Sequence, residues 1–139
     1  MCDSHGHPLH VRITPGQTHE SQALETLLEG AEVVGEEMCE ALHPVRLAGD
    51  KGFRADWIDS YLLDLDIVPV IPSKSNENRD ARPVPFDAKA YCGRNIIERL
   101  IGWLKESRRI LTRFEKTAKN YLGMLKVAFI HRYMRLLCP

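Results

Sequence analysis

Four residues in one segment have the types and spacing needed for chemistry at a phosphodiester. Tyr91, Arg94, Glu98 and Lys105 lie in the segment YCGRNIIERLIGWLKESRRI, whose apolar spacing predicts a helix. At 3.6 residues per turn, a continuous helix would place all four within an arc of about 60°. One face would then carry a phenolic hydroxyl, two cations and one carboxylate, a combination suited to metal binding beside a phosphate group.

Asp50 is a second carboxylate that could hold a metal ion, because it follows a predicted strand over residues 45–48. Phosphoryl transfer to DNA uses two divalent ions about 3.5–4 Å apart, and Mg²⁺ prefers carboxylate and water oxygens. Asp50 and Glu98 can converge only through the fold. Taken alone, Asp50 is more typical of a turn before a helix, and Glu98 of a surface pair with Arg94.

The order of the predicted elements indicates an α/β layered domain. Strands are predicted from alternating or short apolar runs, and helices from apolar residues at helical spacing. The predicted strands cover 9–14, 45–48 and 67–71, and the predicted helices cover 55–65, 91–115 and 118–137. A Pro-rich basic stretch over 72–90 is predicted to be a long loop.

A further helix is predicted after Pro15-Gly16, with Thr18 as its cap and Glu20 in its first turn. Its apolar face is expected to break near Gly30 or Gly35. The residues of that face are Leu24, Leu27, Leu28, Val34 and Met38.

The net charge of zero hides two halves of opposite sign. Residues 1–71 hold 4 Lys and Arg against 13 Asp and Glu, whereas residues 72–139 hold 15 against 6. The basic half is therefore the expected DNA-facing surface. The alternative is two solvated faces that attract each other.

The cysteines and histidines favour no zinc site. None of the four cysteines forms a CxxC pair, and the cluster of His5, His7 and His10 lacks an evident carboxylate partner. No signal peptide is evident, and VAFIHRYMRLL is charged and too short to span a membrane. The absence of paired cysteines is compatible with a reducing compartment, in which free thiols behave as small apolar residues.

The ordered motifs resemble the DDE transposases of bacterial insertion sequences, in the superfamily of groups four and five. The spacing Y-(2)-R-(3)-E-(6)-K resembles the signature of that family, and three further blocks precede it in the family's order. These blocks are MCDSHGHPLHVRITPGQTHESQAL, LAGDKGFRADWI and IPSKSNENR. The resemblance runs through nearly the whole chain.

The resemblance implies that Asp50 and Glu98 are the second and third acids of the catalytic triad. The first Asp belongs to an earlier strand, upstream of anything that corresponds to Met1, whereas Asp3 belongs to the hairpin turn after that strand. The expected fold is an incomplete ribonuclease-H-like, or retroviral-integrase-like, fold that lacks its first two strands. Without these neighbours, the strand over 9–14 is expected to be poorly docked or to pair with a neighbour foreign to the family. The strands over 45–48 and 67–71, with the helices over 55–65, 91–115 and 118–137, are expected to be the ordered part.

The resemblance also assigns roles to the charged residues. Asp50 and Glu98 are expected to be catalytic and to bind Mg²⁺ in an incomplete two-metal site. His19 and Glu20 are expected to be structural or to support the metal ligands from behind, and not to be catalytic. Trp103 is more typical of a core residue than of a base-stacking one. The residues expected to bind DNA are Tyr91, Arg94, Lys105, Lys51, Lys74, Arg79, Arg108 and Arg109, with further phosphate contacts from Arg82 and Arg113.

The expected function is that of a C-terminal part of a transposase that cleaves and transfers DNA strands, inactive alone because the first Asp is absent. Within this partial domain, residues 1–71, 72–90 and 91–139 form an acidic portion, a basic loop and the terminal helices. Expected partners are transposon ends, target DNA, and an N-terminal transposase polypeptide or a second copy. The expected location is the cytoplasm, at the nucleoid, with no membrane partner. The alternatives are a truncated regulator that binds DNA or intact transposase, or a remnant without function.

Overall fold

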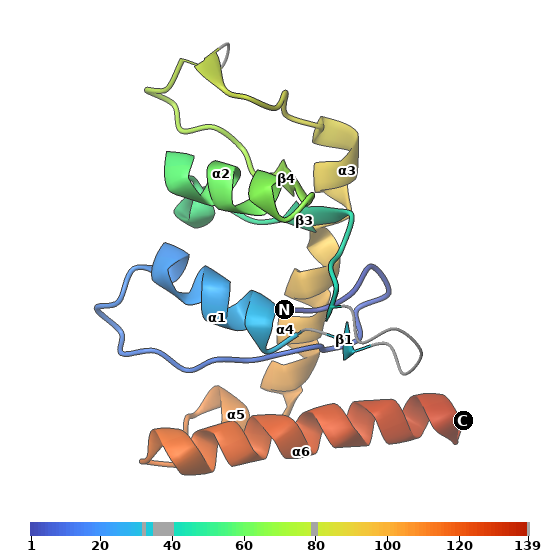
Figure 1. Cartoon of the computed structure of the whole chain (residues 1–139). Coiled ribbons are helices and arrows are strands. Elements are labelled where there is room, and N and C mark those ends of the chain that lie inside the picture. Colours follow the sequence, from blue (N-terminus) through green and yellow to red (C-terminus); the bar gives the residue numbers. More distant parts are fainter. Residues whose placement is uncertain (32, 35–40, 79–80, 139) are drawn as a thin grey trace. The chain divides into compact units, whose positions relative to one another are not determined.

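A computed structural model describes residues 1–31, 33–34, 41–78 and 81–138 of the chain (Figure 1). The chain is mixed α/β and divides into two compact units. The central unit is Gly16–Arg94, and the terminal unit combines Met1–Pro15 with Asn95–Pro139. Each unit has a distinct core and is described on its own.

A strand–helix–strand element is the centre of the central unit. Strand β3 (Arg46–Ala48) pairs in parallel with β4 (Val68–Val70), and the intervening helix α2 (Asp56–Asp64) contacts β4. Parallel strands need such a crossover between them. The predicted strands and the predicted helix between them are confirmed to within one residue at each end.

Apolar residues of α2 and β4 form the core of this element. Ile58 and Leu62 lie one helical turn apart and have no exposed surface, and neither has Ile67 before β4. Val70 and Ile71 are almost as deeply buried. Full burial of each such side chain contributes about 1.5–3 kcal/mol, so this packing fixes the end of β3 where Asp50 follows.

The central unit begins with the 3₁₀ helix η1 (Glu20–Ala23) and helix α1 (Leu24–Glu29). The cap is His19, whose ring accepts a hydrogen bond from the Ser21 amide, so the predicted Thr18 cap is wrong. The predicted break at Gly30 is confirmed, because Gly30 is the C-cap of α1.

The chain does not resume the helix after Gly30. Strand β1 (Val33–Val34) pairs with β2 (Ala41–Leu42) in antiparallel fashion, so the prediction of Val34 on a helical face is wrong. Adjacent β-branched residues favour extended backbone over helix. The predicted apolar position Met38 lies outside the described residues.

Residues 9–14 form no strand, so the predicted strand is wrong. The segment has no ladder, and the isolated bridge near it joins Cys2 to Pro8. Leu9, which the alternation predicted to face a core, is 41% exposed. Alternation alone does not make a strand, because the backbone groups need a neighbouring strand to pair with.

The signature segment is not one helix. It comprises α3 (Ala88–Cys92), α4 (Asn95–Glu106) and α5 (Arg108–Leu111), with interruptions at Gly93–Arg94 and at Ser107. Gly93 is the C-cap of α3, and Ser107 has extended backbone angles. The predicted continuous helix over 91–115 is therefore wrong, and so is the single arc that it would have given the four motif residues.

The terminal unit is built on α4, α5 and the long helix α6 (Ala118–Leu137). The bounds of α6 match the prediction, and the Thr117 hydroxyl caps it by accepting from the Asn120 amide. Leu100 of α4, Ile110 of α5 and Leu125 of α6 are buried apolar residues of this unit. Met134 of α6 is 60% exposed.

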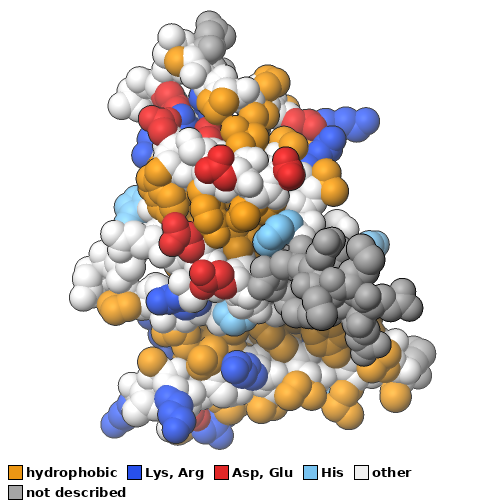
Figure 2. Space-filling view, viewed as in Figure 1, with side chains coloured by type: hydrophobic (Ala, Val, Ile, Leu, Met, Phe, Trp, Pro, Cys, Tyr) orange, Lys and Arg blue, Asp and Glu red, His pale blue; other side chains and the backbone are white. Residues whose placement is uncertain are grey.

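The surface of α6 mixes apolar and basic side chains (Figure 2). Apolar side chains remain exposed along much of its length. They include Val127, Ile130, Met134, Leu136 and Leu137. Among the described residues, no helix is long and apolar enough to cross a membrane.

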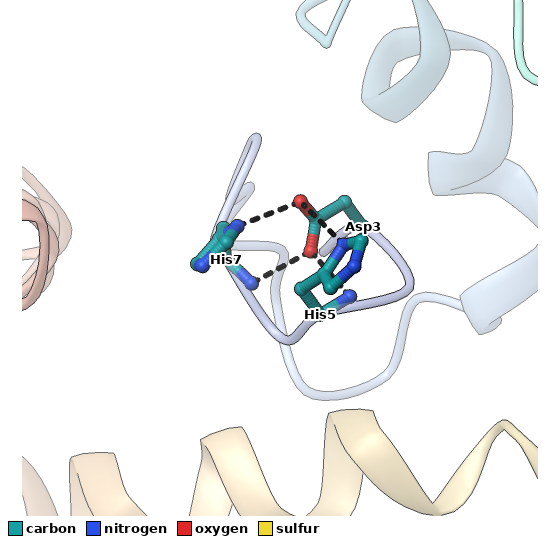
Figure 3. Close-up of side chains that lie close together, drawn as sticks. All are labelled: Asp3, His5 and His7. Atoms are coloured by element: carbon teal, nitrogen blue, oxygen red, sulfur yellow. Dashed lines mark hydrogen bonds and ion pairs between the residues drawn. The ribbon is translucent and has the colours of Figure 1, made fainter. Parts of the chain in front are cut away.

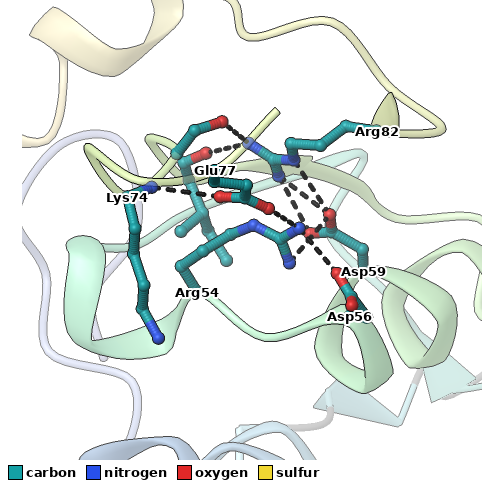
Figure 4. Close-up of polar contacts among 8 residues, drawn as sticks. Arg54, Asp56, Asp59, Lys74, Glu77 and Arg82 are labelled. Carbon is teal, nitrogen blue, oxygen red and sulfur yellow. Dashed lines mark hydrogen bonds and ion pairs between the residues drawn. The ribbon is translucent and has the colours of Figure 1, made fainter. Parts of the chain in front are cut away.

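A buried group of charges fastens residues 72–87 to α2 (Figure 4). Arg54 and Arg82 both point toward the Asp59 carboxylate, and all three side chains are at most 4% exposed. Arg54 also donates to Asp56 and to Glu77. Burial disfavours the charge of Arg54, but its hydrogen bonds to Glu77 and Asp56 outweigh burial and raise its pKa.

Candidate catalytic and nucleic-acid-binding residues

Asp50 stands directly after β3 and caps the short 3₁₀ helix η2 (Lys51–Phe53). Its Oδ1 accepts a hydrogen bond from the Gly52 amide at 2.8 Å. No described residue donates a hydrogen bond to its Oδ2, and the residue is half-buried. Asp50 is thus a turn residue whose second oxygen remains available to a cation.

Glu20 places a second carboxylate beside Asp50. A Cβ atom added at Gly52 would lie 2.7 Å from Glu20 Oε2 and 3.0 Å from Asp50 Oδ1. A larger residue at position 52 would therefore displace the end of the Glu20 side chain from its place beside Asp50, and η1 contacts η2. The resemblance allowed Glu20 a supporting role behind the metal ligands, and its position beside Asp50, 30 positions later in the sequence, is compatible with that role.

Tyr91 and Arg94 come together at the end of α3. The Arg94 guanidinium carbon lies 5.4 Å from the centre of the Tyr91 ring, and Phe86 meets that ring edge-on at 5.2 Å. Helix α3 contacts β4, and its cap residue Asp87 lies 3.6 Å from the Arg46 guanidinium of β3. The pair is therefore held by the same two strands that lead to Asp50.

Glu98 and Lys105 lie on α4 and are both exposed. Since they are seven residues apart, about two turns, they share one face of that helix. Arg108 and Arg109 follow on α5 and are exposed, although Arg109 already pairs with Glu115 and lies 4.9 Å above the Phe114 ring. This part of the terminal unit therefore combines one candidate metal ligand with several cations.

The two candidate acids belong to different units. Asp50 lies in the central unit with Tyr91, Arg94, Lys51 and Lys74, and Glu98 lies in the terminal unit with Lys105, Arg108 and Arg109. Convergence of Asp50 and Glu98 stays a prediction.

The remaining predicted phosphate contacts have different outcomes. Lys51, Lys74 and Arg113 are exposed, and Arg79 lies outside the described residues. The prediction for Arg82 is wrong, because its guanidinium is buried and bonded to Asp59 and to the Ile71 carbonyl. A charge in a basic loop can point inward when a buried carboxylate lies below it.

Trp103 is half-buried and lies near Arg132 and His131 of α6. The Arg132 guanidinium lies 5.1 Å from its ring centre, and the His131 ring stacks at 6.3 Å. The indole borders a pocket of about 330 Å³. Its other lining residues are Leu104, Glu106, Ser107, Ile110, Met124, Val127, Ala128, His131 and Arg135.

The amino-terminal turn corrects one expectation. His5 and His7 do have a carboxylate partner, because Asp3 lies between their rings (Figure 3). His10 is not part of this group among the described residues. Asp3 is in a turn, as predicted.

Comparison with known proteins gives one consistent result. The model of the family described as "Transposase DDE domain" matches residues 1–132. A Brucella ovis protein named as a transposase for insertion sequence element IS6501 is 27% identical over 135 residues, which cover 97% of this chain and 95% of that protein. No solved structure matches the chain.

Proposed function

Because the chain belongs to the DDE transposase family, we propose that it supplies the distal part of a catalytic domain for metal-dependent DNA cleavage and strand transfer. The observation that carries this proposal is the position of Asp50, at the carboxyl end of a parallel strand with one oxygen available and Glu20 beside it. Ligands in open α/β sheets bind at such strand ends.

The donor set around Asp50 fits a hard divalent cation. Both nearby side chains offer carboxylate oxygens, and Mg²⁺ binds through one or two carboxylates plus waters. Asp50 and Glu98 would be ligands, and Glu20 would add negative charge next to Asp50. When bound, the metal pair supplies activation of the attacking hydroxyl and stabilisation of the leaving oxygen.

The chain's cations would hold the DNA. Arg94, kept in place against the Tyr91 ring, can bind a phosphate with two parallel hydrogen bonds. Lys105 and Arg108 are exposed and add point and planar charges on α4 and α5. The parallel β3–α2–β4 element would form part of a ribonuclease-H-like sheet whose remaining strands, with the first Asp, come from another segment.

A second function rests on the exposed cations alone. A chain that binds transposon ends through α4 and α5, without completing the triad, would act as a regulator that competes with intact transposase. It needs the basic residues and not Asp50.

The test separates catalysis from binding. Purified protein is incubated with linear DNA and Mg²⁺, and binding is measured across a salt series. We expect salt-sensitive binding and negligible nicking, because Asp50 and Glu98 alone would supply less negative charge than a metal pair requires. Nicking that Glu98→Gln abolishes and Glu106→Gln preserves would contradict the predicted inactivity. Folded protein without salt-sensitive binding would contradict both functions.

A further inference from the structure

The amino-terminal turn is rigidly built around one carboxylate. Asp3 Oδ1 accepts hydrogen bonds from the backbone amides of His5 and His7, each at 2.8 Å. The Asp3 amide donates to the His7 carbonyl, and Gly6 has a φ of 81°, which favours glycine. These bonds fix the backbone that carries both imidazole rings.

Helix α6 holds this turn from two sides. Arg132 Nε donates to the Gly6 carbonyl at 3.1 Å, and the Tyr133 hydroxyl donates to the Pro8 carbonyl at 2.8 Å. A Cβ at Gly6 would lie 3.1 Å from Ile96 of α4, so the turn packs closely on its own unit. The turn is therefore part of the folded terminal unit.

Three potential metal ligands converge on the outer side of the turn (Figure 3). Asp3 Oδ2 lies 2.8 Å from His7 Nδ1 and 3.9 Å from His5 Nδ1, and one ligand atom from each residue lies within 4.8 Å of the others. The two rings stack at 5.8 Å and 17°. A tetrahedral zinc site with bonds of 2.0–2.1 Å has ligand atoms about 3.3 Å apart, between the two measured distances.

We propose that Asp3, His5 and His7 form a binding site for a zinc-like divalent transition metal, with a fourth position open to water. Two imidazoles and one carboxylate are the donors of open three-ligand zinc sites. His5 is 77% exposed, so an ion can enter without unfolding the turn. Asp3 Oδ1 stays bonded to the backbone, and the ion would replace the hydrogen bond of 2.8 Å between Asp3 Oδ2 and His7 Nδ1.

The ligand types separate this site from the acidic site around Asp50. Imidazole suits Zn²⁺, Ni²⁺ and Cu²⁺, whereas Mg²⁺ prefers oxygen ligands alone. The amino-terminal site is therefore expected to bind Zn²⁺ in the presence of excess Mg²⁺. Its occupancy does not depend on Asp50 or on the proposed catalytic function.

The experiment is a calorimetric titration of the full chain, without an affinity tag, with Zn²⁺ in excess Mg²⁺. We expect saturable binding of one ion per chain. His5→Ala and His7→Ala are each expected to weaken binding by at least about tenfold, the smallest loss typical for disturbed metal sites. Co²⁺ provides a second readout, because ligand-field absorption reports imidazole coordination directly.

Two matched controls identify the ligands. His10→Ala removes a nearby histidine outside the group, and Cys2→Ser removes a nearby thiol, so both are expected to bind Zn²⁺ as the natural chain does. Circular dichroism confirms that each variant is folded. Absence of saturable binding, or unchanged affinity in folded His5→Ala, would overturn the proposal.

Discussion

Asp59 of α2 and Arg82, 23 positions later, form a buried ion pair in which the guanidinium bonds to both carboxylate oxygens. Arg82 Nη2 lies 3.0 Å from Asp59 Oδ1 and 2.9 Å from Oδ2. The same guanidinium donates to the Ile71 carbonyl at 2.7 Å. One arginine therefore ties the loop before α3 to both a helix and the end of the β4 segment.

Replacing Asp59 is expected to destabilise the central unit strongly. Asp59→Ala would leave the buried cations Arg54 and Arg82 without their shared carboxylate, and breaking a buried pair costs about 3–5 kcal/mol. Urea denaturation measures the loss. Asp64→Ala, an exposed acid on the same helix, is the control and should change stability by less than about 0.5 kcal/mol.

Acid is expected to loosen the loop around Glu77. The hydrogen bond from Arg54 lowers the Glu77 pKa below its ordinary value of 4.5, so Glu77 stabilises the fold at neutral pH. That contribution is lost as pH falls through the lowered pKa. The Lys74 amide donates to Glu77 at 3.0 Å, so its protection against hydrogen exchange, measured relative to the intrinsic rate at each pH, should fall in acid. Glu77→Gln should remove this acid step, and a step that persists would assign it elsewhere.

Gly52→Ala is expected to separate the two acids at modest cost in stability. The added Cβ would displace the end of the Glu20 side chain, which is flexible, so the loss should stay near about 1 kcal/mol. Binding of Mn²⁺ in place of Mg²⁺, followed by electron paramagnetic resonance, should weaken. Gly16→Ala meets no atom within 4 Å and is the control. Unchanged Mn²⁺ binding would argue against Glu20 and Asp50 acting together.

Removing exposed cations of α4 and α5 is expected to weaken DNA binding at every sequence. Lys105→Gln and Arg108→Gln should each reduce the slope of log affinity against log salt by roughly 0.9, if each neutralises one phosphate. Fluorescence anisotropy across a salt series measures that slope. Lys126→Gln, an exposed cation of α6 outside the predicted set, should leave it unchanged. Equal losses in all three would indicate a diffuse field instead of a defined contact surface.

The regular elements were predictable where local pattern and tertiary packing agree. Residues 45–48, 55–65 and 67–71 combine short apolar runs with turn residues, and the helix over 118–137 starts at a Thr cap. Prediction failed where the outcome depends on distant partners. Residues 9–14 alternate between apolar and polar side chains, as a strand would, but have no strand to pair with among the described residues.

In the candidate site too, the features set by local sequence were predictable and those set by distant partners were not. Glu98 and Lys105 share one helical face, as their spacing predicted, because both lie on the unbroken helix α4. Tyr91 and Arg94 are separated from them by the interruption at Gly93, where glycine's low helix propensity prevails over the apolar pattern. The inward turn of Arg82 was unpredictable, since it depends on a buried carboxylate 23 positions earlier.

The hydrogen bonds that join the first turn to α6 span 125 and 126 positions. During synthesis, the central unit can fold once Arg94 has left the ribosome, because its contacts lie within a continuous stretch of chain. Residues 1–15 must wait until Arg132 and Tyr133 emerge. The turn that carries Asp3, His5 and His7 is thus among the last parts to dock. Its docking closes a loop of about 125 residues, and contacts between residues so far apart in sequence slow folding.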